Sequence, residues 1–72
     1  MSFTGNNIRA EMGRNRMTVR DVASIAGISD TSFHKKINGE REFTLVELCR
    51  LADRFSVSID YLVERDTGTG KN

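Results

Sequence analysis

The 72-residue chain contains no proline, a single cysteine and a single histidine, and it has no long apolar run. One cysteine excludes an internal disulfide bond, and one cysteine with one histidine is too few for a structural zinc site. No apolar stretch approaches the roughly 18 residues of a membrane-spanning helix. The first residues, MSFTGNNIRAEM, lack the pattern of a signal peptide. We therefore expect no cofactor, metal, small-molecule ligand or membrane partner, and a cytoplasmic location where a free thiol stays reduced.

The size and the charge of the chain bound its architecture. A chain of this length forms one domain that buries only about 60% of its unfolded surface, so it depends on helix packing or on a partner subunit. The net charge is +1, but residues 1–41 carry seven Arg or Lys against four acids, whereas residues 42–72 carry four against six. The basic first half fits an anionic partner, although an ordinary solvated surface has the same composition.

Apolar residues recur at spacings of three and four, which predicts helices and no strands. Thr18 and Thr44 each precede an acid three residues later, the pattern of a capping box, and Gly27 fits the residue that closes a helix. The predicted helices run from an Asn6-Asn7 cap to about Arg16, from Thr18 to Gly27, from Ser29 to Asn38-Gly39, from Thr44 onward, and from Ser58 over IDYLVE. We expect an all-α domain over residues 1–65 and a disordered polar tail over residues 66–72.

The same spacing predicts which side chains are buried. The inner face of the fourth helix would hold Leu45, Leu48, Leu51, Ala52 and Phe55, with Cys49 as a small buried side chain among them. Tyr61 and Val63 fit either the edge of the core or a dimer surface, and the marginal size of the domain favours the dimer surface.

The connection between the second and third predicted helices is very short, because Gly27 ends one and Ser29 begins the next. Two helices joined this tightly cross steeply, as in a helix-turn-helix, whose second helix lies in the major groove of DNA. Such a helix needs one apolar side, here Phe33 and Ile37, and polar groups on the other. Asp30, Thr31, Ser32, His34 and Lys35 are available to the groove, and Arg20, Asn38, Arg41 and the helix starts at Thr18 and Ser29 are placed to meet phosphates.

The run MTVRDVASIAGISDTSFHKKINGEREFTLVELCRLADRFSVSIDYLV resembles the Cro/cI-type (XRE-type) helix-turn-helix domain. The matching landmarks are IRAEM at residue 8, Val22-Ala23, Gly27-Ile28-Ser29, KING at residues 36–39 and the closing VSIDYLV, so the resemblance covers roughly residues 7–63. It implies a compact five-helix, lambda-repressor-like fold, similar to phage or prophage repressors. Family members commonly have Gln where this chain has Val19, which removes one amide donor.

The resemblance also assigns contacts to individual residues. It implies base contacts from Asp30, Thr31 and Lys35, a base or phosphate contact from Ser32, and phosphate contacts from Thr18, Ser29, Asn38 and Arg41. His34 fits a phosphate contact or a plain surface position. Asp30 has two interpretations that the sequence leaves open: a carboxylate stabilised by the helix dipole, or an acceptor for the N4 amine of cytosine.

The functional hypothesis is a sequence-specific transcriptional regulator, expected to be a repressor that blocks polymerase. It would bind a pseudo-palindromic operator in double-stranded DNA as a homodimer, and we expect no appended protease or ligand domain. The alternative is a protein-interaction module on the same fold, similar to an antitoxin or an anti-repressor. An enzyme is not expected, because His34 and Cys49, the only residues of their types, fall on different predicted helices.

Overall fold

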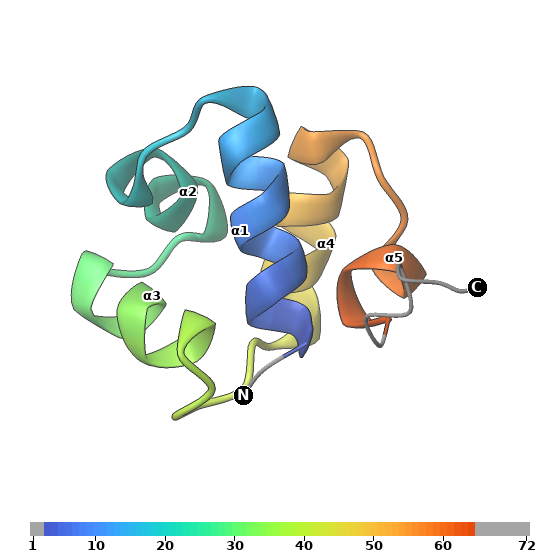
Figure 1. Ribbon diagram of the computed structural model, residues 1–72. Coiled ribbons are helices and arrows are strands. Elements are labelled where there is room, and N and C mark those ends of the chain that lie inside the picture. The colour runs from blue at the N-terminus through green and yellow to red at the C-terminus, as the bar shows by residue number, and fades with distance from the viewer. Residues whose placement is uncertain (1–2, 65–72) are drawn as a thin grey trace.

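The computed structural model describes residues 3–64, which form five helices and no strand. The helices are α1 (Phe3–Asn15), α2 (Val19–Ala26), α3 (Asp30–Ile37), α4 (Leu45–Phe55) and α5 (Ile59–Val63). Figure 1 shows α1 in the centre, with α2 and α3 on one side, α5 on the other and α4 behind. The all-α expectation is confirmed for these residues, and the predicted polar tail over residues 66–72 lies outside them.

The predicted capping residues set the helix boundaries. The hydroxyl oxygens of Thr18 and Thr44 each accept from a backbone N–H three residues later at 3.2 Å, and the acids there, Asp21 and Glu47, each accept from the cap's own N–H at 3.0 Å. Gly27 closes α2 with a left-handed backbone, φ 81°. The start of α3 is capped by Ser29 and that of α5 by Ser58. Four of the five helix starts therefore follow from the sequence.

The predicted start of α1 is wrong. The helix begins at Phe3, upstream of the expected Asn6-Asn7 cap. The side-chain amide of Asn7 instead donates to the carbonyl oxygens of Tyr61, Leu62 and Glu64, at 3.1, 3.0 and 2.8 Å. Carbonyl groups at a helix end lack partners within the helix, so Asn7 satisfies the end of the short α5 and holds it on α1.

All five helices contribute to one hydrophobic core. Ile8, Val22, Phe33, Leu51 and Leu62 come from α1 to α5 in order, and each is fully buried. Burying one such side chain contributes about 1.5–3 kcal/mol. A chain with a core this small therefore depends on every one of its helices, including the five-residue α5.

Two of the predicted core positions are wrong. Leu45 is 67% exposed, and Cys49 is also exposed. The inner face of α4 centres on Leu48, Leu51 and Phe55, all of which are buried. Because each residue turns a helix by about 100°, Cys49 points away from the side that Leu48 occupies. Leu45 opens the helix and lies at the margin of that face.

The apolar side of α3 holds this helix on the domain. Phe33 and Ile37 are buried, and the Phe33 ring meets Phe43 edge to face with centroids 6.0 Å apart. Behind Ile37 the backbone of α1 comes very close, because a Cβ built on Gly5 would overlap the Ile37 carbonyl oxygen. Gly5 is therefore the position that lets α1 and the end of α3 touch.

An ion pair fixes α3 to α4 on a second side. Lys36 Nζ donates to both carboxylate oxygens of Glu47, at 2.7 and 2.8 Å, and each side chain is only about one-tenth exposed. Burial would raise the pKa of Glu47, but the hydrogen bonds from Lys36 and Thr44 outweigh it and hold that pKa below its ordinary value. Lys36 therefore serves a contact inside the domain.

We predict opposite effects for alanine at two glycines of α1. Gly5→Ala should lower the free energy of unfolding by about 1–3 kcal/mol, because a methyl group there overlaps backbone that has no room to move. Gly13→Ala, whose added Cβ meets nothing within 4 Å, should raise it by about 0.5–1 kcal/mol, since glycine weakens a helix. Urea unfolding of both variants measures the difference. Equal stability of the wild type and Gly5→Ala would refute the close approach of α1 and α3.

We predict that the Lys36–Glu47 contact weakens in acid. A carboxyl group whose folded pKa is lowered stabilises the fold fully above its ordinary pKa of 4.5, and this contribution is lost as the pH falls through the lower folded value. Glu47→Gln should therefore cost about 2 kcal/mol at pH 7, and the gap to the wild type should narrow below about pH 4.5. Urea unfolding across pH 3–7 measures this gap. Glu42→Gln, which removes an exposed carboxylate, is the control and should stay within about 0.5 kcal/mol at every pH.

Candidate nucleic-acid interface

One side of α3 carries polar side chains that face away from the core. Asp30, Thr31 and His34 are exposed, and Ser32 and Lys35 are half-buried. Thr31 and Lys35 lie four residues apart and so share a helix face, the one roughly opposite the buried Phe33 and Ile37. The structure thus brings the predicted base-contacting residues onto one short helix whose other side is fixed.

The start of α3 holds two polar residues, Ser29 and Asp30, of which only Ser29 bonds to the helix backbone. Ser29 Oγ accepts from the N–H of Ser32 at 3.1 Å, so Ser29 satisfies the helix start. The Asp30 carboxylate is exposed and makes no hydrogen bond or ion pair within residues 3–64. The helix dipole still stabilises it, but all its acceptor positions remain available for a partner outside the domain.

The start of α2 presents Thr18 and Arg20 at the surface. The N–H of Thr18 donates to Asp21 Oδ2 at 3.0 Å, and the Thr18 hydroxyl oxygen accepts from the Asp21 N–H at 3.2 Å, so both groups of Thr18 take part in the helix cap. The backbone N–H of Thr18, and then its hydroxyl, hold the pKa of the Asp21 carboxyl below the ordinary value. Asp21 therefore stays ionised as part of the cap, and Arg20 beside it is exposed and basic.

Asn38, at the end of α3, is held by a residue that the sequence analysis did not single out. Arg9 Nη2 of α1 donates to Asn38 Oδ1 at 2.7 Å. This bond occupies Oδ1 of the exposed Asn38, so its amide N–H groups are left as donors with a guanidinium nearby. No pattern in the sequence links two residues 29 positions apart, so Arg9 becomes visible as a candidate phosphate contact only in the fold.

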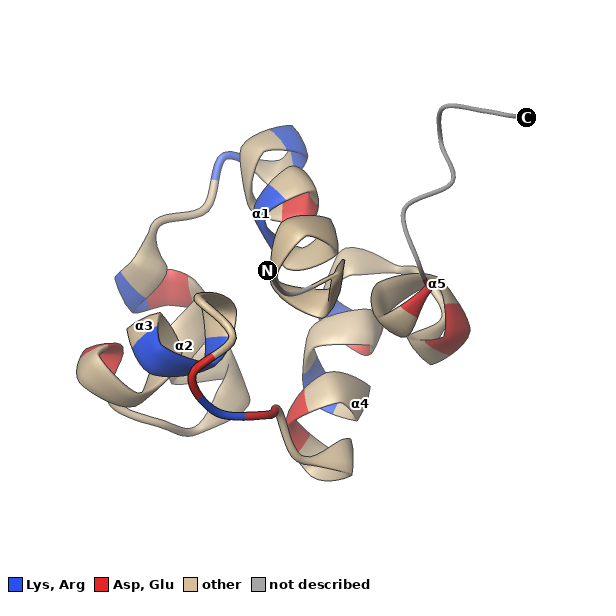
Figure 2. Ribbon diagram, turned by 60° about the horizontal axis from the view of Figure 1, so that its bottom comes forward, with Lys and Arg blue, Asp and Glu red and all other residues tan. Residues whose placement is uncertain are grey.

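The turn after α3 carries the last predicted phosphate contact, Arg41. Gly39 has a left-handed backbone, φ 87°, and the N–H of Glu40 donates to the Lys35 carbonyl oxygen at 2.9 Å. Figure 2 shows this turn as one basic residue between two acids, next to the basic residues of α3. Arg41 is exposed, and it lies at the opposite end of α3 from Ser29.

The two residues predicted for a dimer surface differ in their surroundings. Tyr61 is half-buried, and its hydroxyl donates to Glu11 Oε2 at 2.9 Å. Glu11 is only 1% exposed and also pairs with Arg14 at 2.8 Å. Burial, followed by the Glu11 carboxylate, raises the pKa of Tyr61. Tyr61 therefore serves contacts inside the domain, whereas Val63 is 46% exposed.

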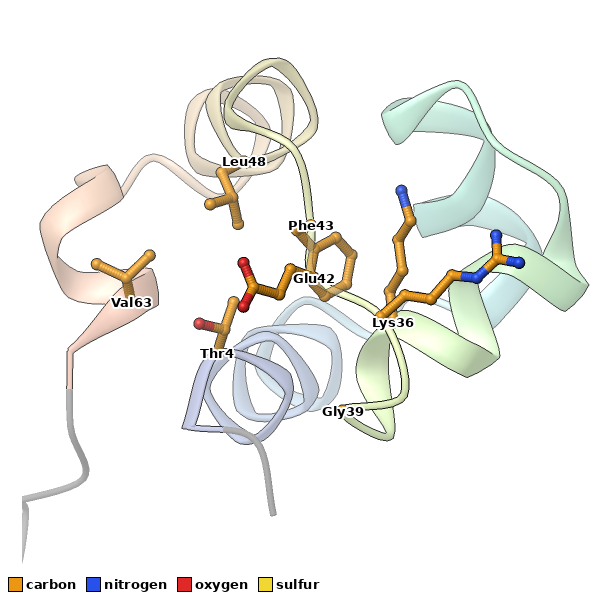
Figure 3. A pocket seen from close by; sticks show the side chains of 8 residues that line it. Thr4, Lys36, Gly39, Glu42, Phe43, Leu48 and Val63 are labelled. Carbon is orange, nitrogen blue, oxygen red and sulfur yellow. The ribbon is translucent and has the colours of Figure 1, made fainter.

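Val63 lines a hollow of about 340 Å³ between α1, α4, α5 and the turn after α3. Figure 3 shows Thr4, Leu48 and Val63 turned toward this space from three different helices. No group of three or more potential metal-ligating side chains occurs among residues 3–64. No helix in the same range is long and apolar enough to cross a membrane.

Comparison with known protein families agrees with this geometry. A family model described as the Cro/C1-type HTH DNA-binding domain matches residues 7–68, which include all five helices except the start of α1. Searches of curated proteins and of solved structures found no match. The two helices α2 and α3 with their tight turn are the helix-turn-helix of this family. The chain belongs to the Cro/C1-type HTH DNA-binding domain family.

Proposed function

We propose that this protein is a sequence-specific transcriptional regulator, acting as a repressor, that lays α3 in the major groove of double-stranded DNA. One observation carries the proposal: α3 is held on the core by Phe33 and Ile37 and exposes short polar side chains on its other side. Membership of a DNA-binding family supports the same conclusion. Bound at a promoter, the domain would exclude polymerase by occupying its site.

The polar face of α3 supports direct readout of bases. Lys35 would donate to the O6 and N7 acceptors of guanine, and Asp30 would accept from the N4 amine of cytosine. Thr31 and Ser32 would contact neighbouring base edges. Because the Asp30 carboxylate would repel phosphates, it would also disfavour binding to DNA of the wrong sequence.

Donors on both sides of this face would hold the sugar–phosphate backbone. Such contacts fix the register of the helix without reading the sequence. They would come from Thr18, Arg20, Ser29, His34, Asn38 and Arg41. The bond between Arg9 and Asn38 supports this role, because it occupies Oδ1 of Asn38 and leaves its amide N–H groups as donors.

We propose further that two copies bind a pseudo-palindromic operator, with their α3 helices about one helical turn of DNA apart. Val63 is the better supported of the two predicted interface residues, since it is exposed, while Tyr61 is occupied by Glu11. Marginal domain size is the physical reason to expect association.

A protein-interaction role remains the second candidate, and a specific observation favours it. Large apolar side chains are exposed at Phe3, Leu45, Val46 and Val63. Contiguous exposed apolar surface often marks a protein contact, and Leu45 and Val46 are neighbours at the start of α4. Salt dependence identifies DNA binding. The logarithm of DNA affinity falls linearly with the logarithm of salt concentration, with a slope of about −0.9 for each phosphate contacted. A chain that binds no duplex even at low salt would favour the interaction module.

We predict that substitutions in α3 change sequence preference, whereas a substitution in the turn does not. Selection of duplexes from a random DNA pool should give a defined motif for the wild type. Lys35→Ala, Thr31→Ala and Asp30→Ala should each relax it at a separate base position, by about 1–3 kcal/mol. Arg41→Ala, the comparison variant, should weaken all duplexes alike and leave the motif intact. An unchanged motif for Lys35→Ala would show that the base-reading assignment is wrong.

We predict that a charge at position 63 prevents association of two copies. Val63→Lys should shift the sedimentation of the protein to that of a monomer, because a buried ammonium group without a partner is costly. Val46→Lys, at a similarly exposed valine of α4, is the matched control and should sediment as the wild type does. If both variants stay dimeric, Val63 lies outside the interface.

A further inference from the structure

A second hollow, of about 530 Å³, lies where the end of α1, the start of α2 and the end of α4 meet. Each of these three segments contributes one arginine to its lining: Arg16, Arg20 and Arg54. All three side chains are exposed. Figure 2 shows basic residues where α1 ends and α2 begins. The hollow is therefore positively charged on several sides.

The arginines of this hollow differ from most other basic residues in their lack of internal partners. Arg9, Arg14, Lys36 and Arg50 donate to Asn38, Glu11, Glu47 and the Ala26 carbonyl oxygen, respectively. No guanidinium of the hollow makes a hydrogen bond or ion pair of this kind within residues 3–64. Of the remaining basic residues in that range, Lys35 lies on the predicted groove-facing side of α3 and Arg41 lies in the turn after it. None of the three guanidinium groups thus links two helices through a hydrogen bond within these residues.

The one acid of the hollow, Asp21, offsets only part of this charge: after the hydrogen bonds from Thr18, the charge of Arg54 also lowers the pKa of its carboxyl. Asp21 accepts from the N–H of Thr18 and completes the α2 capping box. The lining thus holds three positive groups against one negative group that is bound to the helix start. The partial positive charge at the α2 N-terminus adds to the attraction for an anion. Ser24 adds an exposed hydroxyl to the same lining.

We propose that this arginine hollow binds a backbone phosphate of duplex DNA that lies beyond the bases read by α3. The proposal rests on the proposed function, since it extends the same DNA-binding surface. Arg20 and the neighbouring Thr18 are already placed to meet phosphate, and Arg16 and Arg54 continue that surface onto α1 and α4. Arginine suits this role, because its planar fork of donors matches a phosphate and remains charged at any physiological pH.

The test compares a short duplex that carries only the selected motif with a longer duplex that adds about ten base pairs on each side. The wild type should bind the longer duplex more tightly and with a steeper salt dependence. Arg54→Gln and Arg16→Gln should each reduce that slope by about 0.9, which corresponds to roughly a tenfold loss of affinity near 0.1 M salt. Neither should change the selected motif. Arg14→Gln removes the same charge from α1 outside the hollow and should bind both duplexes as the wild type does.

The outcomes separate this inference from the function on which it rests. If the wild type binds both duplexes but Arg54→Gln and Arg16→Gln behave as the wild type does, the hollow is not a DNA contact. If the wild type binds neither duplex at low salt, the proposed function fails and the inference fails with it.

Titration with inorganic phosphate at constant ionic strength should give no saturable shift of the Arg16 and Arg54 resonances. A saturable shift would identify the free ion as the occupant and overturn the DNA assignment.

Discussion

The attachment of α3 to the core through Phe33 and Ile37 is the constraint on which the rest of the structure depends. A helix of eight residues is too short to be stable alone, so its orientation comes from what it packs against. Phe33 is fully buried and Ile37 is nearly so. The absence of a side chain at Gly5 lets the α1 backbone contact the backbone of Ile37. Lys36 forms an ion pair with Glu47 of α4. Because Phe33, Ile37 and Lys36 hold α3 in place, the polar residues on its exposed side can differ in sequence without loss of the fold.

The division of the basic residues follows from the same arrangement. Lys36 joins α3 to α4 and Arg50 joins α4 to the end of α2, whereas Arg14 pairs with the buried Glu11 within α1. Basic residues without such a partner gather on α3, in the turn after it, and around the hollow at the start of α2. A net charge of only +1 therefore conceals a surface on which positive groups are concentrated in two places. That concentration, more than the total charge, fits a phosphate backbone.

Much of the fold was predictable from the sequence because its determinants are local. Thr18, Ser29, Thr44 and Ser58 cap helices through bonds that span three residues, so their pattern is visible in the chain. The errors concern contacts between distant segments or the margin of a helix face. Asn7 bonds carbonyl groups more than fifty residues away, and Arg9 meets Asn38 across two helices. Leu45 and Cys49 are apolar, yet helical spacing alone does not say how wide the buried face of α4 is.

The central claim is that the outward side of α3 meets DNA, and amide chemical-shift mapping tests it most directly. Titration of the labelled protein with the duplex that it selects should shift the resonances of residues 29–38 and of Thr18–Arg20 most strongly. The outer face of α4 around Leu45 and Val46 should change little, since neither residue is among the proposed contacts. Large shifts confined to that outer face or to α5, with residues 29–38 unchanged, would contradict the account.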